Sequence, residues 1–429
     1  MGAPLKRPGA RRAIDDHLRE LGELADTAGA TIVGELTQQV DRPHPGTYLG
    51  KGKIDELREL VVVKDASLVI FDEELSPSQG KNIEDAIGKR VMDRAELILD
   101  IFATRARTSE AKMQVELAQL EYMLPRLTRM WTHLEKFRGG IGMRGPGETQ
   151  LETDRRLINH RIKILRERLQ DVQRGRAVQR QSRASQFKAS LVGYTNAGKS
   201  SILRALSGQD VFVEDRLFAT LDPLTRDVDL GDNAHVLITD TVGFIRKLPH
   251  HLVASFRATL EETRDADLLL HVIDASSSTW EEQRVVVEQV LDELGVNDRP
   301  KLLVFNKIDL IDHDELLALQ ERISSLVPTS VFVSAVGEEG LEPLRRALAT
   351  ALRTRRPLTE IRMSPADGKL LAEIHRAGEV VEQRMDGDRL LVRARVDEVL
   401  AGRLRRAGAE VSNGNGQREG AGKTTKTRH

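Results

Sequence analysis

Two patterns of apolar and polar positions alternate over residues 1–104. Residues 31–34 and 67–71 are short apolar runs typical of buried strands, whereas residues 54–62 carry apolar side chains at helical spacing. Ser76-Pro77 fits the beginning of a further helix, because proline is tolerated in a first helical turn. This alternation of strands and helices predicts an N-terminal α/β subdomain with a parallel sheet.

The period becomes helical from about residue 108, and we assign residues 105–186 to an antiparallel helical hairpin. Apolar residues recur there at steps of three and four over two segments that a loop separates. They are Met113, Leu117, Leu120 and Leu124, and then Ile158, Ile162, Leu165, Leu169 and Val172. Two such faces can bury each other, so the stripes are interpreted as packing.

Short apolar runs and helical segments alternate again over residues 187–354, which predicts a central α/β domain. Residues 359–411 combine an alternating strand, 389–395, with two helical segments, so a small α+β domain is expected. The tail, 412–429, is rich in Gly, Asn, Lys and Thr and is expected to be disordered.

Composition narrows the class of protein. A chain of 429 residues is too long for one core, and the absence of cysteine excludes disulfides, thiolate zinc sites and cysteine nucleophiles. No apolar run approaches the roughly 18 residues of a membrane span, and the basic N-terminus lacks the apolar centre of a signal peptide. We expect a cytoplasmic protein without a membrane span, and a monomer.

The charge is unevenly distributed along the chain. The net charge is −1, yet residues 101–190 contain 19 Lys and Arg against 9 Asp and Glu. A basic segment on an acidic protein indicates a polyanionic partner, although solvated helix faces give the same counts. The loop 138–150 has five glycines and a proline around Arg138 and Arg144, so it could present both arginines to RNA phosphates. The alternative is a simple connector.

A phosphate-binding loop stands at the centre of the chain. Gly193-x-x-x-x-Gly198-Lys199-Ser200 has the full spacing of that motif, between a predicted strand and a predicted helix. Glycines allow the backbone N–H groups to face phosphates, Lys199 would reach the β- and γ-phosphate oxygens, and Ser200 would ligate Mg²⁺. A glycine-rich turn is the alternative, and the strand-loop-helix context favours the nucleotide site.

Further motifs follow predicted strands. Asp240, 40 residues after Ser200, would hold Mg²⁺ through a water, and the N–H of Gly243 would sense the γ-phosphate. The Asp309 carboxylate can accept two hydrogen bonds from guanine, which adenine cannot donate. Asn306 would brace the loop, the Lys307 stem would cover the base, and residues 334–336 would offer an N–H to guanine O6. The sequence therefore predicts GTP rather than ATP.

These motifs are the signature of the translation-factor-related GTPases. Within that class the chain resembles the HflX family of ribosome-associated GTPases over roughly residues 25–355. The likeness rests on RGGIGMRGPGETQLETDRR (138–156), GYTNAGKS (193–200), LFATLDP (217–223), DTVGFIRKLPHHLVASF (240–256), YLGKGK (48–53) and residues 97–120. Family members usually have an apolar strand before the region matching residues 15–24. This chain has a short basic stretch instead, which leaves two expectations open: a first sheet that is one strand short, or a start that lies further upstream.

The resemblance implies a site and a partner. Residues 218–222 would form the first switch, with Thr220 as a second hydroxyl ligand of Mg²⁺; the sequence alone leaves Thr220 and Thr225 open. Residues 1–183 would dock on the large ribosomal subunit and its RNA, with arginines 138, 144, 155 and 156 as contacts. The implied GTP-binding residues are Gly193, Tyr194, Thr195, Asn196, Ala197, Gly198, Lys199, Ser200, Phe218, Ala219, Thr220, Leu221, Asp222, Asp240, Thr241, Val242, Gly243, Asn306, Lys307, Ile308, Asp309, Ser334, Ala335 and Val336.

Lys199, Thr220 and Gly243 are the predicted catalytic residues, and Ser200, Thr220 and Asp240 the predicted Mg²⁺ site. Many GTPases have a glutamine after D-x-x-G that orients the attacking water, but this chain has Phe244 there. A slow intrinsic rate and a ribosomal activator are therefore expected. Asn196 could help to hold a K⁺ ion beside the phosphates, or it could only stabilise the turn.

The sequence therefore indicates a Mg²⁺-dependent GTPase that binds the large ribosomal subunit and splits or rescues stalled ribosomes, cycling between GTP and GDP. Two alternatives stay open: an assembly factor of the large subunit, and a signalling adaptor controlled by its nucleotide. A metabolic kinase is disfavoured, because it would leave the guanine motif at residues 306–309 unexplained.

Overall fold

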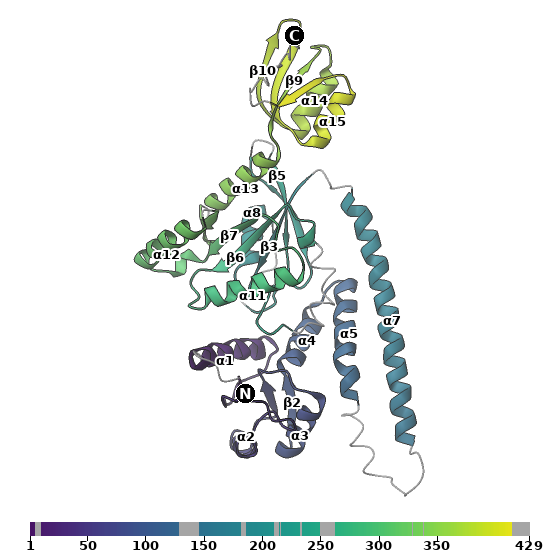
Figure 1. The fold of residues 1–429 in the computed structure, drawn as a ribbon, viewed down its shortest axis with the longest axis vertical. Helices are drawn as coiled ribbons and strands as arrows, with labels where there is room; N and C mark the ends of the chain where they lie inside the picture. The colour runs from purple at the N-terminus through teal and green to yellow at the C-terminus, as the bar shows by residue number, and fades with distance from the viewer. Residues whose placement is uncertain are drawn as a thin grey trace, which may run out of the picture.

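The computed structural model describes residues 1–4, 10–127, 146–181, 186–209, 214, 216–231, 234–248, 262–327, 329–337 and 339–413, with the backbone alone for 10–13, 146–151, 176–181, 326 and 413. No helix among these residues is long and apolar enough to cross a membrane. Figure 1 shows the N-terminal elements at one end of the molecule, the largest sheet in the middle and the last strands at the other end.

The N-terminal elements form the predicted α/β unit around a short parallel sheet. β1 and β2 pair in register, from Leu68 beside Arg90 to Phe71 beside Asp93. Helix α3 begins as predicted, since Ser76 and Gln79 form a reciprocal capping box and Pro77 fills the first turn. The elements are α1 (Ala10–Thr27), α2 (Lys51–Val63), β1 (Leu68–Phe71), α3 (Pro77–Ile87), β2 (Arg90–Asp93) and α4 (Arg94–Arg105).

One predicted strand is absent. Residues 31–34 form no strand, although their apolar run predicts one. A strand needs a partner along its edge, and the nearest extended backbone, Met1–Pro4, pairs only further along, with residues 36–40. The prediction for residues 31–34 was therefore wrong for this structure, because an apolar run alone does not supply a neighbour.

The helical hairpin is formed by α5 (Ser109–Met123), η1 (Leu124–Arg126) and α7 (Pro146–Gln181), and α5 and α7 lie side by side (Figure 1). Most of the predicted apolar stripe forms one cluster between them, with Leu165 fully buried. Arg161 and Arg166 of α7 pair with Glu116 and Glu121 of α5. The hairpin packs as its periodicity predicts.

The central domain has a six-stranded sheet of order β4-β5-β3-β6-β7-β8, in which only β4 runs antiparallel to its neighbour. Its strands are β3 (Phe187–Gly193), β4 (Leu224–Asp229), β5 (His235–Asp240), β6 (Leu268–Asp274), β7 (Lys301–Asn306) and β8 (Ser330–Phe332). The accompanying helices are α8 (Lys199–Ser207), α11 (Trp280–Glu293), η2 (Ile308–Leu310), α12 (His313–Leu326) and α13 (Glu342–Arg355). Parallel order places the carboxyl ends of β3, β5 and β7 at one edge, where ligands bind in such folds.

The last elements form a separate antiparallel sheet with its own core. They are β9 (Leu358–Met363), α14 (Gly368–Ala377), β10 (Glu379–Asp386), β11 (Arg389–Arg395), α15 (Glu398–Arg406) and β12 (Glu410–Asn413). The order β10-β11-β9-β12 makes a split β-α-β unit of the ferredoxin-like kind. The rest of the predicted tail, 414–429, lies outside the described residues.

Candidate functional site

The phosphate-binding loop joins β3 to α8, and two of its glycines are sterically required. A Cβ on Gly193 would lie 2.3 Å from the carbonyl oxygen of Val272 on neighbouring β6. Gly198 has φ of +90°, and a Cβ there would lie 2.2 Å from Nδ2 of Asn306. The loop is therefore pressed against β6 and against the end of β7, which brings the two predicted nucleotide motifs together.

Lys199 begins α8 and is buried within the loop. Its Nζ donates to the carbonyl oxygens of Tyr194 at 2.8 Å and Gly193 at 3.3 Å. Burial lowers the pKa of Lys199 to about 8, although nearby Asp240 favours the charged form. A bound triphosphate would add negative charge beside this ammonium, so it would raise that pKa and favour the protonated side chain.

Three oxygen-bearing side chains meet at the amino end of α8. Ser200 Oγ lies 2.7 Å from Thr220 Oγ1 and donates to Asp240 Oδ2 at 2.5 Å. Asp240 is fully buried, so its pKa is raised, and its Oδ1 has no hydrogen-bond partner among the described residues. Hydroxyl and carboxylate oxygens suit Mg²⁺, and a buried carboxylate oxygen without a donor fits a cation. The structure thus places Thr220, rather than Thr225, beside Ser200. The Thr225 hydroxyl forms a hydrogen bond with Thr239 instead.

Residues at the end of β7 make hydrogen bonds to the phosphate-binding loop and to the loop 334–336. Asn306 donates from Nδ2 to the carbonyl oxygen of Ala197 at 2.9 Å and accepts from the N–H of Ala335 at 3.2 Å. Asp309 Oδ1 accepts from Ser334 Oγ at 2.5 Å. Asn306 thus holds the phosphate loop and the loop 334–336 in place, and Ser334 orients the Asp309 carboxylate beside them.

Lys307 follows Asn306 with a left-handed backbone, φ +63°, and its Nζ pairs with Asp274 at 2.8 Å. This pair fixes the lysine stem at the end of β6 and β7. The N–H of Ala335, one of the groups proposed to face guanine O6, bonds Asn306 in this structure, and the N–H of Val336 bonds Ser334 Oγ.

The segment 243–247, the second switch segment, lies against the phosphate loop. The N–H of Phe244 donates to Gly193 at 3.0 Å, and the N–H of Thr195 donates to Phe244 at 2.7 Å. The side chains of Phe244 and Ile245 are each 1% exposed and enter the core. Neither can orient a water, which agrees with the sequence argument. Asn196 has φ of +60°, so it occupies a turn position that asparagine tolerates.

The first switch segment, 218–222, faces the N-terminal region as well as the phosphate loop. Phe218, Ala219 and Thr220 line a cavity of about 50 Å³ with Lys199 and Gly243. Phe218 also makes an edge-to-face contact with Phe102 of α4, centroids 4.7 Å apart. Asp222 turns away from the cavity: its carboxylate accepts from the N–H groups of Arg107 and Thr108, just before α5.

Sequence reasoning missed the contacts that connect the nucleotide site to the N-terminal region. The Tyr194 hydroxyl donates to Glu20 of α1 and accepts from the N–H of Arg246 at 2.9 Å. Arg94 of α4 pairs with Glu20 and with Asp72, and Lys247 pairs with Asp72 at 2.5 Å. Glu214 and Arg216 also line the phosphate cavity. Tyr194, Arg246 and Lys247 lie in the stretches that carry the family resemblance, but no motif marks their contacts with the N-terminal region, because the partners are far away in sequence.

Glu20, Asp72, Arg94, Arg246 and Lys247 form a charge cluster in which two buried carboxylates are held by buried Arg94, partly buried Arg246 and exposed Lys247. Burial alone would raise the pKa of Asp72, but Arg94 and Lys247 outweigh burial and hold it below its usual range. The Asp72 carboxylate therefore stays charged at neutral pH, and the ion pairs of Glu20 and Asp72 tie the second switch segment to the N-terminal region.

We expect Arg94→Met to lower the free energy of unfolding of the chain by about 3–5 kcal/mol, because it leaves two buried carboxylates without their shared cation. The measurement is urea unfolding followed by circular dichroism. Arg90→Met is the matched control: Arg90 pairs with Glu96 at the surface, 60% exposed, and its loss should cost less than about 1 kcal/mol. Equal losses in both variants would contradict a stabilising buried cluster.

The proposed RNA contacts are only partly described. Arg155 and Arg156 lie on exposed positions of α7. Arg138 and Arg144 lie outside the described residues, as does the loop from residue 138 to residue 145. The prediction of a loop was wrong for residues 146–150, which begin α7, because proline is tolerated in the first turn of a helix. Arg155 and Arg156 belong to the first third of α7, and the beginning of this helix lies far from the central sheet (Figure 1).

The sheet order, the phosphate loop after β3 and the guanine motif after β7 define a P-loop GTPase. Family models agree over three stretches: "GTP-binding GTPase N-terminal" matches residues 15–103, "GTP-binding GTPase Middle Region" residues 105–183, and "50S ribosome-binding GTPase" residues 188–307. The chain is 45% identical to the GTPase HflX of Caldanaerobacter subterraneus, over 91% of this chain and 90% of that protein. It is also 45% identical to the GTPase HflX of Escherichia coli, over 87% and 88%.

The chain belongs to the HflX family of GTPases, and it binds and hydrolyses GTP. Among solved structures, a GTP-binding protein from Sulfolobus solfataricus in complex with GDP is 26% identical, covers 82% of this chain and 98% of its own, and has a TM-score of 0.44. P-loop GTPases generally use Mg²⁺, and the oxygen set at Ser200, Thr220 and Asp240 fits that ion.

Proposed function

We propose that this GTPase binds the large ribosomal subunit in the cytoplasm, through the RNA of that subunit, and splits or rescues stalled ribosomes in a GTP-dependent manner. The observation that carries the proposal is the contact of both switch segments with the N-terminal region, which continues into the basic hairpin. The family model "50S ribosome-binding GTPase" supports it, since it matches residues 188–307. We also propose the division into residues 1–104, 105–186, 187–354 and 359–411, and a monomer.

The chemistry proposed for the site follows its geometry. Lys199 neutralises charge on the β- and γ-phosphates, and Mg²⁺ on Ser200 and Thr220, with Asp240 through water, stabilises the transferred phosphoryl group. Gly243 offers its N–H to the γ-phosphate. Asp309 accepts two hydrogen bonds from guanine, and Asn306 keeps the loops around the base in register.

The bound nucleotide, GTP or GDP, would change the position of the hairpin through two sets of contacts. Movement of the second switch segment at Gly243 displaces Arg246 and Lys247, which pair with Glu20 and Asp72. Movement of the first switch segment displaces Asp222, whose carboxylate accepts hydrogen bonds from the N–H groups of Arg107 and Thr108 just before α5. GTP and GDP would then favour different arrangements of the hairpin relative to the central sheet.

Splitting requires the GTP state to bind the separated large subunit more tightly than the whole ribosome. A ligand shifts an equilibrium only by its difference in affinity for the two states. To raise the equilibrium constant for subunit separation tenfold, the protein must bind the separated subunit about 1.4 kcal/mol more tightly than the whole ribosome. The hairpin supplies the RNA contact. On α7, Arg161 and Arg166 pair with glutamates, whereas Arg155 and Arg156 are exposed. Arg155 and Arg156, with Arg138 and Arg144, are the proposed phosphate contacts.

The test is sedimentation of purified whole ribosomes with the protein and a non-hydrolysable GTP analogue, GDP or no nucleotide. Separated subunits with the analogue alone support splitting. An assembly factor would leave the ribosomes joined, and a signalling adaptor would not co-sediment. Arg155→Glu with Arg156→Glu should abolish co-sedimentation. Arg376→Glu with Arg406→Glu, an equal charge change on exposed positions of α14 and α15, should not.

We further propose that Asn196 helps to hold K⁺ beside the phosphates, and we expect hydrolysis to be about tenfold faster in KCl than in NaCl at matched ionic strength, a barrier difference of about 1.4 kcal/mol. Asn196→Gly keeps the left-handed turn and removes the side-chain oxygen. It should remove the salt difference and retain GTP binding. Equal rates of hydrolysis in both salts for the unaltered protein would exclude a role for K⁺.

A further inference from the structure

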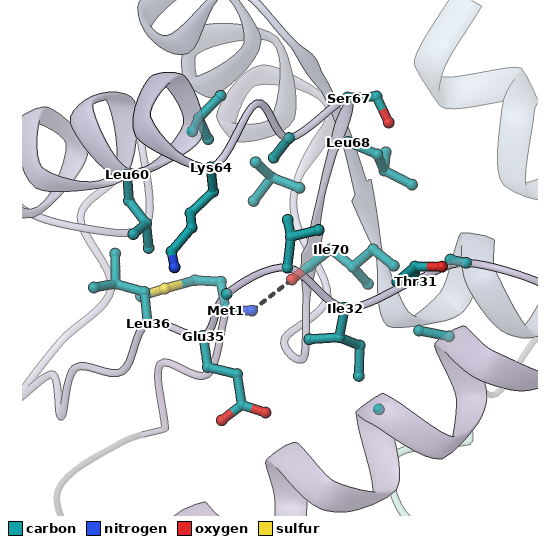
Figure 2. A pocket seen from close by; sticks show the side chains of 18 of the residues that line it. Met1, Thr31, Ile32, Glu35, Leu36, Leu60, Lys64, Ser67, Leu68 and Ile70 are labelled. Carbon is teal, nitrogen blue, oxygen red and sulfur yellow. Dashed lines mark hydrogen bonds between the residues drawn. The ribbon is translucent and has the colours of Figure 1, made fainter.

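The cavities of this chain differ in the chemistry of their walls. A cavity of about 470 Å³ in the N-terminal region is lined mostly by apolar side chains, among them Leu60, Leu68 and Ile70 (Figure 2). The cavity over the phosphate loop is only about 50 Å³, and its described walls carry hydroxyl groups and two cationic side chains, Lys199 and Arg216. The smaller cavity therefore has the charge that a phosphate group requires.

Arg216 is the cation that the phosphate-loop motif does not account for. Lys199 belongs to the motif, and its Nζ already donates to two carbonyl oxygens of the loop. Arg216 lies outside the motif, is exposed, and makes no hydrogen bond or ion pair with another residue that the structure describes. A guanidinium has five N–H donors and is always charged, so this side chain can offer both positive charge and donors to a bound phosphate.

Helix α4 of the N-terminal region holds the chain on both sides of Arg216. Two residues before Arg216, Glu214 pairs with Arg105 at the end of α4. Two residues after it, Phe218 is 2% exposed and packs edge-to-face on Phe102 of α4, with ring centroids 4.7 Å apart. Contacts with α4 thus fix the segment within two residues of Arg216 in either direction.

The backbone of Phe218 is strained. Its φ is +56°, in the left-handed region, which a bulky aromatic residue rarely adopts. Such a conformation costs free energy and persists only where the surrounding contacts enforce it, as they often do at functional sites. The contact with Phe102 enforces it here, so α4 fixes the turn that carries Arg216 past the phosphate cavity.

We propose that Arg216 is a catalytic residue of GTP hydrolysis, supplied to the phosphates by the chain itself, and that Arg105 is a positioning residue for it. In hydrolysis, the oxygen of water bonds to the γ-phosphorus, and the bond from that phosphorus to the β,γ-bridging oxygen breaks. The electron pair of the broken bond moves to GDP, and both protons of the water leave with dihydrogen phosphate. Negative charge grows on the bridging oxygen, and Arg216 donates to the β- and γ-phosphate oxygens as that charge grows.

This role differs from that of the missing water-orienting glutamine. Phe244 occupies the position of that glutamine, and Arg216 does not replace it, because a guanidinium has no acceptor for a proton of the attacking water. Arg216 stabilises the leaving group, and the water still requires an activator to orient it. The inference rests on GTP hydrolysis alone, and it is independent of the proposed ribosome binding and of the proposed K⁺ site.

The test compares Arg216→Gln with the unaltered full chain, without ribosomes and in one KCl buffer. We expect the single-turnover rate of GTP hydrolysis to fall about 100-fold, while the affinity for GDP changes by less than about twofold. Binding of GDP with aluminium fluoride should be lost, because that complex mimics the transferred phosphoryl group. Arg204→Gln is the matched control: it removes the same charge from an exposed position of α8 outside the cavity wall, and it should leave all three measurements unchanged.

Arg105→Gln tests the positioning role. It should lower the single-turnover rate about tenfold in the otherwise unaltered chain, and not at all in a chain that already carries Arg216→Gln, because it acts through Arg216. A further loss in the double variant would show that Arg105 acts on hydrolysis by another route, and would overturn its positioning role.

An unchanged rate in Arg216→Gln overturns the catalytic role. Equal losses of rate and of GDP affinity also overturn it, because a group that binds the ground state and the transition state alike does not accelerate the chemical step. If circular dichroism shows that Arg216→Gln does not fold, Arg216→Lys decides by the same measurements. Lysine lacks the guanidinium fork, so we expect about a tenth of the unaltered rate, and a full rate would overturn the proposal.

Discussion

Asp309→Asn is expected to exchange guanine specificity for xanthine specificity. The Asp309 carboxylate is proposed to accept from two guanine donors, and an amide in its place loses one acceptor and leaves a donor facing the guanine amine. Sites that depend on such pairs discriminate by about 10⁴-fold, so GTP affinity should fall by about that factor relative to xanthosine triphosphate. The measurement is calorimetric titration of both nucleotides.

Asp314→Asn is the matched control for this experiment. Asp314 lies in the first turn of α12, only five residues further along, and is exposed. It should leave the ratio of the two affinities unchanged. A protein with Asp309→Asn that still prefers GTP over xanthosine triphosphate would show that Asp309 does not read the base.

Purified large ribosomal subunits are expected to raise GTP turnover by about 10³-fold. Phe244 stands where many GTPases have a water-orienting glutamine, and its side chain is buried with Ile245, so the isolated site lacks a group for the attacking water. Activators that complete such sites raise turnover by about 10³ to 10⁵. Phosphate release with and without subunits, under multiple turnover, measures the effect.

The charge-reversed variant Arg155→Glu with Arg156→Glu separates binding from catalysis. It should lose the acceleration, because the proposed RNA contact is gone. It should keep the slow intrinsic rate, because both arginines lie near the beginning of α7, which packs on α5. Equal turnover of the unaltered protein with and without ribosomal subunits would contradict the activator role.

Local patterns predicted the fold class well, and the reasons are physical. The phosphate loop needs glycine at Gly193 and Gly198 because the neighbouring strands leave no room for a Cβ, so its spacing is visible in sequence. The stripe from Leu117 to Leu169 follows helical period and packs as one cluster. The same kind of argument predicted a strand at residues 31–34 that the structure does not contain, because strand formation depends on a neighbouring strand that periodicity does not reveal.

The connection between the nucleotide site and the N-terminal region could not be predicted. Tyr194 occupies a variable position of the phosphate loop, and its partner Glu20 is 174 residues away. Arg94 and Asp72 read as ordinary surface charges in a polar stretch, yet both are almost fully buried. Only the packing of α1 and α4 against the central domain reveals them as one cluster.

The length of α7 turns small movements into large ones. Its 36 residues extend about 54 Å, and β3 is the next element along the chain. A tilt of about 5° at the carboxyl end of α7 would carry the Pro146 end through about 5 Å, roughly one helical turn. A rearrangement of a few tenths of an ångström around a phosphate would thus become a displacement of several ångströms at a surface far from the nucleotide.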